Sequence, residues 1–216
     1  MKKLIPFFIA FIFLASCSSE ETIELDETLL KSYKITKNEQ GRYSIDYEVK
    51  EDASVDVVKD IKTNYNEIYL FSGKVAMGNK RSESLSIEND QLKVGFFENN
   101  QKRKSVIIED DNIVLAKGEE SSEFLEQYSV EDLGDENYQL NFKVRDGVNV
   151  VFVYNELEDI YEVHLKEGKS NGVSFSKTYS KTSEVLKIDF VNYSNNFAKA
   201  TESNIEKMPR VVIITL

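Results

Sequence analysis

Apolar and polar residues alternate along most of the chain after residue 29. Tyr43-Ser-Ile-Asp-Tyr-Glu-Val49 alternates over seven positions, and Tyr138-Gln-Leu-Asn-Phe-Lys-Val144 repeats the pattern. Successive side chains of a strand point to opposite faces, so this period is typical of a half-buried β-strand. Val, Ile, Tyr and Phe are frequent in these runs, and the chain has only two prolines. The pattern therefore predicts an all-β protein.

The strand-like segments occur twice in the same order. The two segments above lie 138 − 43 = 95 residues apart, and a deletion and an insertion change the offset to 94 and then to 105 further on. The matched positions are Tyr33 and Tyr128, Val55 and Val150, Leu70 and Leu165, 92–96 and 186–190, and 106–108 and 211–213. Apolar alternation alone would align one strand by chance, but not five in order. The sequence thus contains an internal duplication.

Each copy has about seven short strands in roughly 95 residues. In the first copy we expect them near 30–36, 43–49, 54–59, 66–72, 82–87, 91–97 and 104–109. This number and spacing resemble an immunoglobulin-like or fibronectin-III-like sandwich, which implies two tandem seven-stranded β-sandwich domains. The tryptophan and cysteine pair of antibody domains are absent, so the resemblance concerns architecture only. A small up-and-down barrel is the alternative.

Polar stretches divide the chain. The apolar-free segment 117–123 separates the copies. The expected organisation is a signal peptide at 1–16, an acidic tether at 17–28, repeats at 29–116 and 124–216, and a linker at 117–123.

The amino-terminal segment has the three parts of a secretory signal. Lys2 and Lys3 precede an unbroken apolar run from Leu4 to Leu14, which is too short to span a bilayer as a helix. Leu14-Ala15-Ser16-Cys17 resembles the lipobox of bacterial lipoproteins. This resemblance implies cleavage before Cys17 and lipid on its thiol, which would anchor the chain to a membrane. The alternative is an ordinary secretory signal with an incidental cysteine.

The residues after Cys17 bear on location. Ser18 stands where the family's inner-membrane retention signal usually has aspartate, so the resemblance implies the outer membrane. Ser18-Ser-Glu-Glu21 is similar to the acidic stretch that directs some such lipoproteins to the cell surface. A solvated tether that leaves the protein on the periplasmic side is the alternative.

Charge and composition exclude several classes of partner and site. The formal charge is −11 and becomes −13 when residues 1–16, with two lysines, are removed. Such a chain repels phosphate backbones, which argues against nucleic acid. With one histidine and one cysteine, a multi-histidine metal site and a disulfide are both impossible within the chain.

Two sets of residues are candidates for catalysis. His164 lies between Val163 and Leu165, so alternation points it away from the core, and its counterpart is Tyr69. Glu156, Glu158 and Asp159 resemble a paired-carboxylate site, but they fall in an expected turn. A surface histidine and a solvated acidic loop are the simpler interpretations.

Two further sets suggest binding. Glu109, Asp110 and Asp111 end the first copy, and carboxylates at a junction are suitable ligands for calcium. The run resembles the inter-domain calcium segments of cadherins, without their full spacing. A charged loop is the simpler interpretation, so calcium is a hypothetical cofactor.

The second copy gains 105 − 94 = 11 residues between its last two strands. There Tyr193 and Phe197 offer stacking, and Asn195 and Asn196 offer amide hydrogen bonds, to a sugar or peptide. A tolerated insertion is the alternative.

These observations predict a non-catalytic cell-envelope lipoprotein that acts as a binding or assembly module for a glycan or a protein. One alternative is a structural spacer subunit of an envelope complex. The other is a carboxylate-dependent hydrolase.

Overall fold

The structure, a computed structural model, describes residues 28–60, 65–73, 79–85, 87, 91–110, 124–193 and 206–215. The strands of these residues are β1 (Leu30–Lys37), β2 (Tyr43–Val49), β3 (Ala53–Asp60), β4 (Tyr65–Ser72), β5 (Lys80–Leu85), β6 (Gln91–Glu98), β7 (Gln101–Glu109), β8 (Leu125–Gly134), β9 (Asn137–Val144), β10 (Val148–Asn155), β11 (Ile160–Glu167), β12 (Ser174–Ser180), β13 (Val185–Tyr193) and β14 (Glu206–Thr215).

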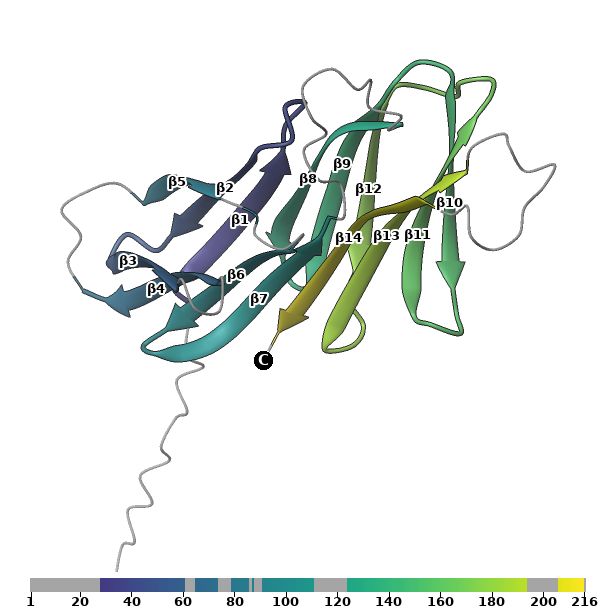
Figure 1. The fold of residues 1–216 in the computed structure, drawn as a ribbon. Helices are drawn as coiled ribbons and strands as arrows, with labels where there is room; N and C mark the ends of the chain where they lie inside the picture. The colour runs from purple at the N-terminus through teal and green to yellow at the C-terminus, as the bar shows by residue number, and fades with distance from the viewer. Residues whose placement is uncertain are drawn as a thin grey trace, which may run out of the picture.

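The strands form two sheets that pack face to face (Figure 1). One sheet has six strands in the order β12-β9-β8-β1-β2-β5. The other has eight strands in the order β10-β11-β13-β14-β7-β6-β4-β3. The prediction of an all-β sandwich is therefore confirmed.

The seven strands expected in the first copy are all present, within three residues of their expected bounds. β7 begins at Gln101 rather than at residue 104. β5 begins at Lys80 rather than at residue 82. It begins earlier because Lys80 is the register partner of Glu48, and the Asn79 carbonyl accepts a hydrogen bond from the Val49 amide.

The two copies share both sheets. β1 pairs with its counterpart β8, and β7 pairs with its counterpart β14, both antiparallel. Ile35 lies opposite Val130 and Ile107 opposite Val212. The differences, 130 − 35 = 95 and 212 − 107 = 105, equal the sequence offsets, so a pseudo-twofold axis passes through both pairs. Whether either copy folds by itself as a domain stays a prediction.

The strand order in each copy differs from the immunoglobulin arrangement. There the third strand neighbours the sixth, in purely antiparallel sheets. Here β4 lies between β3 and β6 and pairs with β6 in parallel, and β11 pairs with β13 in the same way. The likeness to immunoglobulin domains is thus limited to the two-layer architecture.

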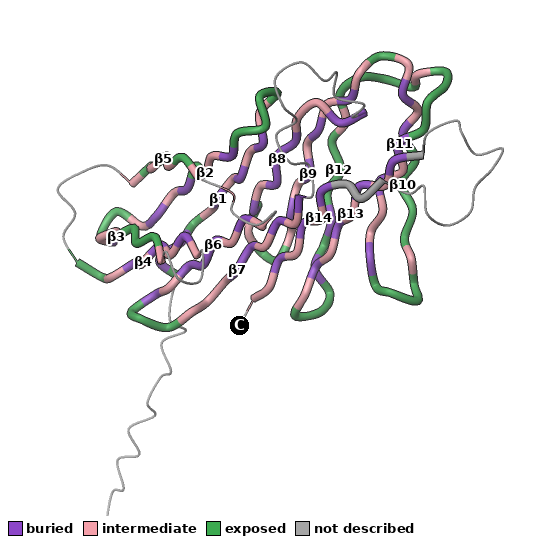
Figure 2. Tube along the Cα trace, in the orientation of Figure 1, coloured by how far each residue is buried: buried purple, intermediate pink, exposed green. Residues whose placement is uncertain are grey.

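One hydrophobic core fills the space between the sheets of both copies. Burial alternates along the strands, as the sequence pattern predicts (Figure 2). The largest fully buried side chains include Tyr33, Phe96 and Leu140. A continuous core supports one cooperative unit.

Two ion pairs, the first buried and the second half-buried, join the sheets near the pseudo-twofold axis. Lys37 Nζ on β1 lies 2.8 Å from Asp110 Oδ2, which follows β7, and the Tyr43 hydroxyl donates to the same oxygen at 2.6 Å. The second pair joins Lys104 on β7 to Asp132 on β8. Because 132 − 37 = 95, Asp132 occupies the position equivalent to Lys37. The six-stranded sheet therefore contributes the lysine to one ion pair and the aspartate to the other.

Candidate functional site

The outer face of the six-stranded sheet has a row of short polar side chains. The register aligns one residue from every strand across it. In strand order these are Ser176, Asn141, Ser129, Thr36, Ser44 and Ser84. They share a face because paired residues of neighbouring strands point the same way.

A groove of about 650 Å³ lies on this face. Thr36, Ser129 and Asn141 form its floor. Longer side chains rise on both sides, Lys34 with its register partner Asp46 on one and Lys143 with Gln127 on the other. The short floor residues between longer neighbours explain why the sheet is hollowed here.

Ser129 is the most buried polar side chain of the groove floor. Its exposed fraction is 7%, and its hydroxyl has no hydrogen-bond partner among the described residues. Asn141 beside it donates from Nδ2 to Gln139 Oε1 at 3.4 Å. The Ser129 hydroxyl is not among the fully buried unpartnered atoms of the described residues, so its oxygen reaches the surface of the groove. The floor therefore has hydrogen-bonding capacity to offer a ligand.

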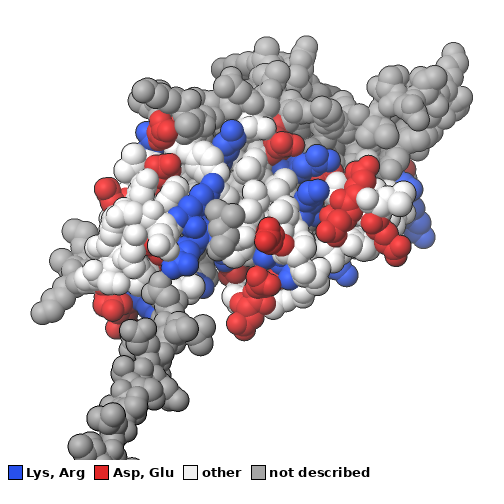
Figure 3. Space-filling model, turned by 90° about the horizontal axis from the view of Figure 1, so that it is seen from below, with Lys and Arg blue, Asp and Glu red and all other residues white. Residues whose placement is uncertain are grey.

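The charged side chains of the groove have both signs. Lys143 Nζ lies 2.9 Å from Glu126 and 3.2 Å from Glu39, and hydrogen bonds to these carboxylates raise the pKa of Lys143. Lys34 lies 3.5 Å from Glu131. Acidic and basic side chains are also interspersed on the side of the molecule that is seen from below (Figure 3). There the basic side chains of the described residues form a narrow band. The balance suits an uncharged polar ligand better than a polyanion.

The groove is asymmetric about the pseudo-twofold axis. Its floor residues Ser129 and Asn141 are equivalent, at the offset of 95, to Lys34 and Asp46. In the second copy a short side chain thus replaces a lysine, and an amide replaces a carboxylate. The groove is lined by residues of both copies, and Ser129 and Asn141 in its lining are positions at which the copies differ.

Sequence reasoning identified the duplication but missed these residues. The signal was the polar difference between copies, Lys34 against Ser129 and Asp46 against Asn141. It gains meaning only when the register shows that these positions lie on adjacent strands of one face.

The structure describes two of the three residues predicted to bind calcium, and their side chains point to opposite faces of the eight-stranded sheet. Glu109 accepts a hydrogen bond from Gln91 at 3.2 Å on the outer face of the eight-stranded sheet. Asp110 points into the sandwich, where it binds Lys37 and Tyr43. Asp111 lies outside the described residues. Calcium at these three residues stays a prediction, and the described residues contain no cluster of three potential metal ligands.

The other binding predictions fall largely outside the described residues. Asn195, Asn196 and Phe197 lie there, as does Cys17. Tyr193 ends β13, but its side chain is not described. Binding by this loop and lipidation at Cys17 stay predictions.

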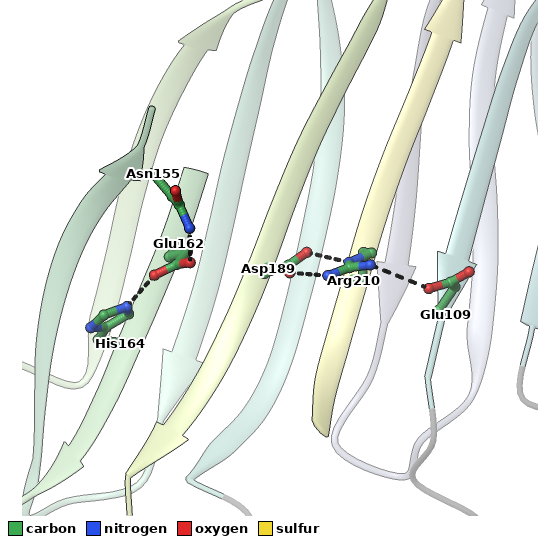
Figure 4. A network of polar contacts seen from close by, with 6 residues as sticks. All are labelled: Glu109, Asn155, Glu162, His164, Asp189 and Arg210. Carbon is green, nitrogen blue, oxygen red and sulfur yellow. Dashed lines mark hydrogen bonds and ion pairs between the residues drawn. The ribbon is translucent and has the colours of Figure 1, made fainter. Parts of the chain in front are cut away.

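His164 points away from the core, as expected, but it is only 14% exposed. Its Nε2 lies 2.6 Å from Glu162 Oε2, and Asn155 Nδ2 donates to Glu162 Oε1 at 3.2 Å (Figure 4). Burial raises the pKa of Glu162, but the hydrogen bonds from His164 and Asn155 outweigh it and leave that pKa lowered. These contacts give His164 a structural role on β11.

A second network lies beside it on the same face (Figure 4). Arg210 binds Asp189 through two hydrogen bonds of 2.7 and 2.6 Å and lies 4.0 Å from Glu109. It therefore links the two copies on β13, β14 and β7. Glu156, Glu158 and Asp159 lie in an exposed turn, as the sequence predicts.

Comparison with protein families, characterised proteins and solved structures finds no match for this chain. Among the described residues, no helix is long and apolar enough to cross a membrane.

Proposed function

We propose that this protein is a lipid-anchored cell-envelope protein of the outer membrane that binds a glycan, without catalysis, in the groove of the six-stranded sheet. The observation that supports the proposal most is the Ser129 hydroxyl in the groove lining, which has no hydrogen-bond partner among the described residues and lies beside the Asn141 amide. The anchor rests on the lipobox-like segment that ends at Cys17.

The chemistry of the groove favours a glycan. Sugar hydroxyls both donate and accept hydrogen bonds, as the hydroxyl, amide, carboxylate and ammonium groups of the groove do. The groove volume of about 650 Å³ is in the range of small-ligand sites. Its lining comes from five adjacent strands, which span roughly 19 Å at the usual strand spacing. That length suits a short oligosaccharide rather than a single sugar.

A soluble chain that begins at Ser19 keeps every described residue and allows a direct test. It is screened against an array of envelope and extracellular oligosaccharides, and hits are measured by calorimetry. Ser129→Lys restores the residue of the first copy and fills the floor, so affinity should fall at least tenfold. Ser44→Lys is the matched control, because Ser44 lies in the same row but does not line the groove. It should bind like the wild type.

Asn141→Asp is a second, milder variant that removes the amide donor. Thermal melting shows whether each variant folds. The proposal is wrong if no oligosaccharide binds at millimolar concentration, or if folded Ser129→Lys and Asn141→Asp both bind like the wild type.

One observation bears on the hydrolase alternative. Two-carboxylate glycosidases place an acid and a second carboxylate across the scissile bond. Asp46 is the one carboxylate among the described residues that line the groove. This favours binding, and an assay for reducing ends with each glycan hit distinguishes binding from hydrolysis.

The structural spacer is favoured by a different observation, the continuity of both sheets across the copies. A spacer would need no ligand in the groove. Two results together would favour the spacer. The envelope complex would assemble normally in cells that carry Ser129→Lys, and the wild-type protein would bind no glycan.

A further inference from the structure

The edge strand β10 carries an exposed apolar run. Val151, Phe152, Val153 and Tyr154 are 36–47% exposed, and these four residues are consecutive (Figure 2). β10 is the last strand of the eight-stranded sheet and pairs with β11 on one side only, within the described residues. Exposed edges of this kind favour pairing with another strand.

The equivalent edge of the first copy is protected by charge. At the offset of 95, Asp56, Lys59 and Asp60 of β3 correspond to Val151, Tyr154 and Asn155 of β10. Charged side chains are a usual means of preventing edge-to-edge association. The second copy has lost all three charges, although both edges have the same place in the fold.

The backbone of β10 shows which groups remain available. Asn171 binds both backbone groups of Val150, as acceptor from its N–H at 3.0 Å and as donor to its carbonyl at 2.9 Å. Val150 therefore faces the open edge, and Asn171 covers it. Because backbone groups alternate along a strand, those of Phe152 and Tyr154 face the same edge beyond the cover.

We infer that β10 pairs with β10 of a second copy of this chain, antiparallel, with Val153 opposite its own counterpart. In this register Phe152 lies opposite Tyr154 of the second copy, and the two residues can exchange both backbone hydrogen bonds. The covered Val150 falls just outside the paired stretch. This inference does not depend on the proposed glycan site.

Three features favour a second copy as the occupant. The strand has no charged residue from Val148 to Asn155, so self-pairing opposes no like charges. When the register is centred on one residue, the core-facing side chains of both copies lie on the same face of the joined sheet, because side chains alternate with a period of two. The fold already joins its own copies in this way, at Ile35 with Val130 and at Ile107 with Val212.

A cysteine cross-link tests the register. The soluble chain from Ser19 has no cysteine, because Cys17 is the only one in the sequence. Val153→Cys places two thiols across the axis at a non-hydrogen-bonded pair, where Cα atoms lie about 4.5 Å apart, within disulfide range. Oxidation should give mostly dimer on a non-reducing gel. Val58→Cys, at the equivalent and equally exposed position of β3, should give at least tenfold less.

Sedimentation equilibrium tests the association without a cross-link. The wild-type chain should dimerise at tens of micromolar, and Val153→Lys should weaken the dimer at least tenfold, whereas Val58→Lys should not. Hydrogen exchange needs no variant, since the amides of Phe152 and Tyr154 should become more protected as concentration rises. A wild-type monomer at 500 µM, or equal cross-linking of the Val58→Cys and Val153→Cys variants, would overturn the inference.

Discussion

The buried pair of Lys37 and Asp110 gives a quantitative prediction about how the sheets are joined. The side chains are only 10% and 2% exposed, so each charge depends on the other. Asp110→Leu should lower the free energy of unfolding by about 3–5 kcal/mol, because it leaves the Lys37 ammonium buried without its carboxylate. Lys37→Met should cost a similar amount for the converse reason.

The double variant distinguishes ion pairing from packing. Replacing both members of a buried pair with apolar residues of similar volume is often nearly neutral. Lys37→Met/Asp110→Leu should therefore lie within about 2 kcal/mol of the wild type, since Tyr43 keeps its hydrogen bond to Tyr128. The summed loss of unfolding free energy in the two single variants should then exceed the loss in the double variant by at least about 3 kcal/mol.

The assay is urea unfolding of the soluble chain, followed by far-ultraviolet circular dichroism at neutral pH. Glu131→Ala is the matched control. It breaks the exposed pair with Lys34, in which both side chains are more than a third exposed, and it should cost less than about 1 kcal/mol. Additive effects of the two buried changes would refute the reasoning, as would a double variant that unfolds more easily than either single one.

Three further predictions concern pH, packing and location. Burial raises the pKa of Tyr128 well above its usual 10; the hydrogen bond with Tyr43 lowers that pKa and the charge of Asp110 raises it, both by less. The contribution of Tyr128 to stability is therefore complete below pH 10 and falls above it, approaching a loss of about 1.4 kcal/mol per pH unit. Tyr128→Phe should reduce the loss of stability from pH 10 to 11, measured by urea unfolding, by about 1 kcal/mol; an unchanged loss would contradict this. Gly95→Val should lower the melting temperature by several degrees, because a Cβ there meets aromatic carbons of neighbouring side chains at 3.0–3.3 Å, whereas Gly73→Ala, with no atom within 4 Å, should change it little; equal effects would refute the packing argument. Cys17→Ser should move the full chain from the membrane to the soluble fraction of cells, and retention in the membrane fraction would argue against lipidation.

The sequence predicts strands well and their neighbours poorly. Alternation shows which residues share a face, so the expected strands of the first copy are present. It says nothing about which strands lie side by side, because hydrogen bonding between backbones is independent of side-chain identity. The pairing of β1 with β8 and of β7 with β14, and the parallel pairing of β4 with β6, therefore required the structure.

The candidate site could not be predicted for the same reason, since it depends on which strands are neighbours. Ser129 and Asn141 are inconspicuous in sequence, since short polar residues on an outer face have no distinctive pattern. They gain significance when register aligns them across neighbouring strands and the pseudo-twofold axis identifies Lys34 and Asp46 as their counterparts. The proposed site also lies where the copies differ, but sequence alone drew attention to the longest insertion rather than to these substitutions.

The glycan site can be located most directly by nuclear magnetic resonance. The isotope-labelled soluble chain is titrated with the best-binding oligosaccharide, and amide shifts are mapped on the fold. We expect the largest changes at Thr36, Ser129 and Asn141, and their loss in Ser129→Lys. Changes centred instead on the loop after Tyr193 or on β10, or none at all, would contradict the assignment of the groove.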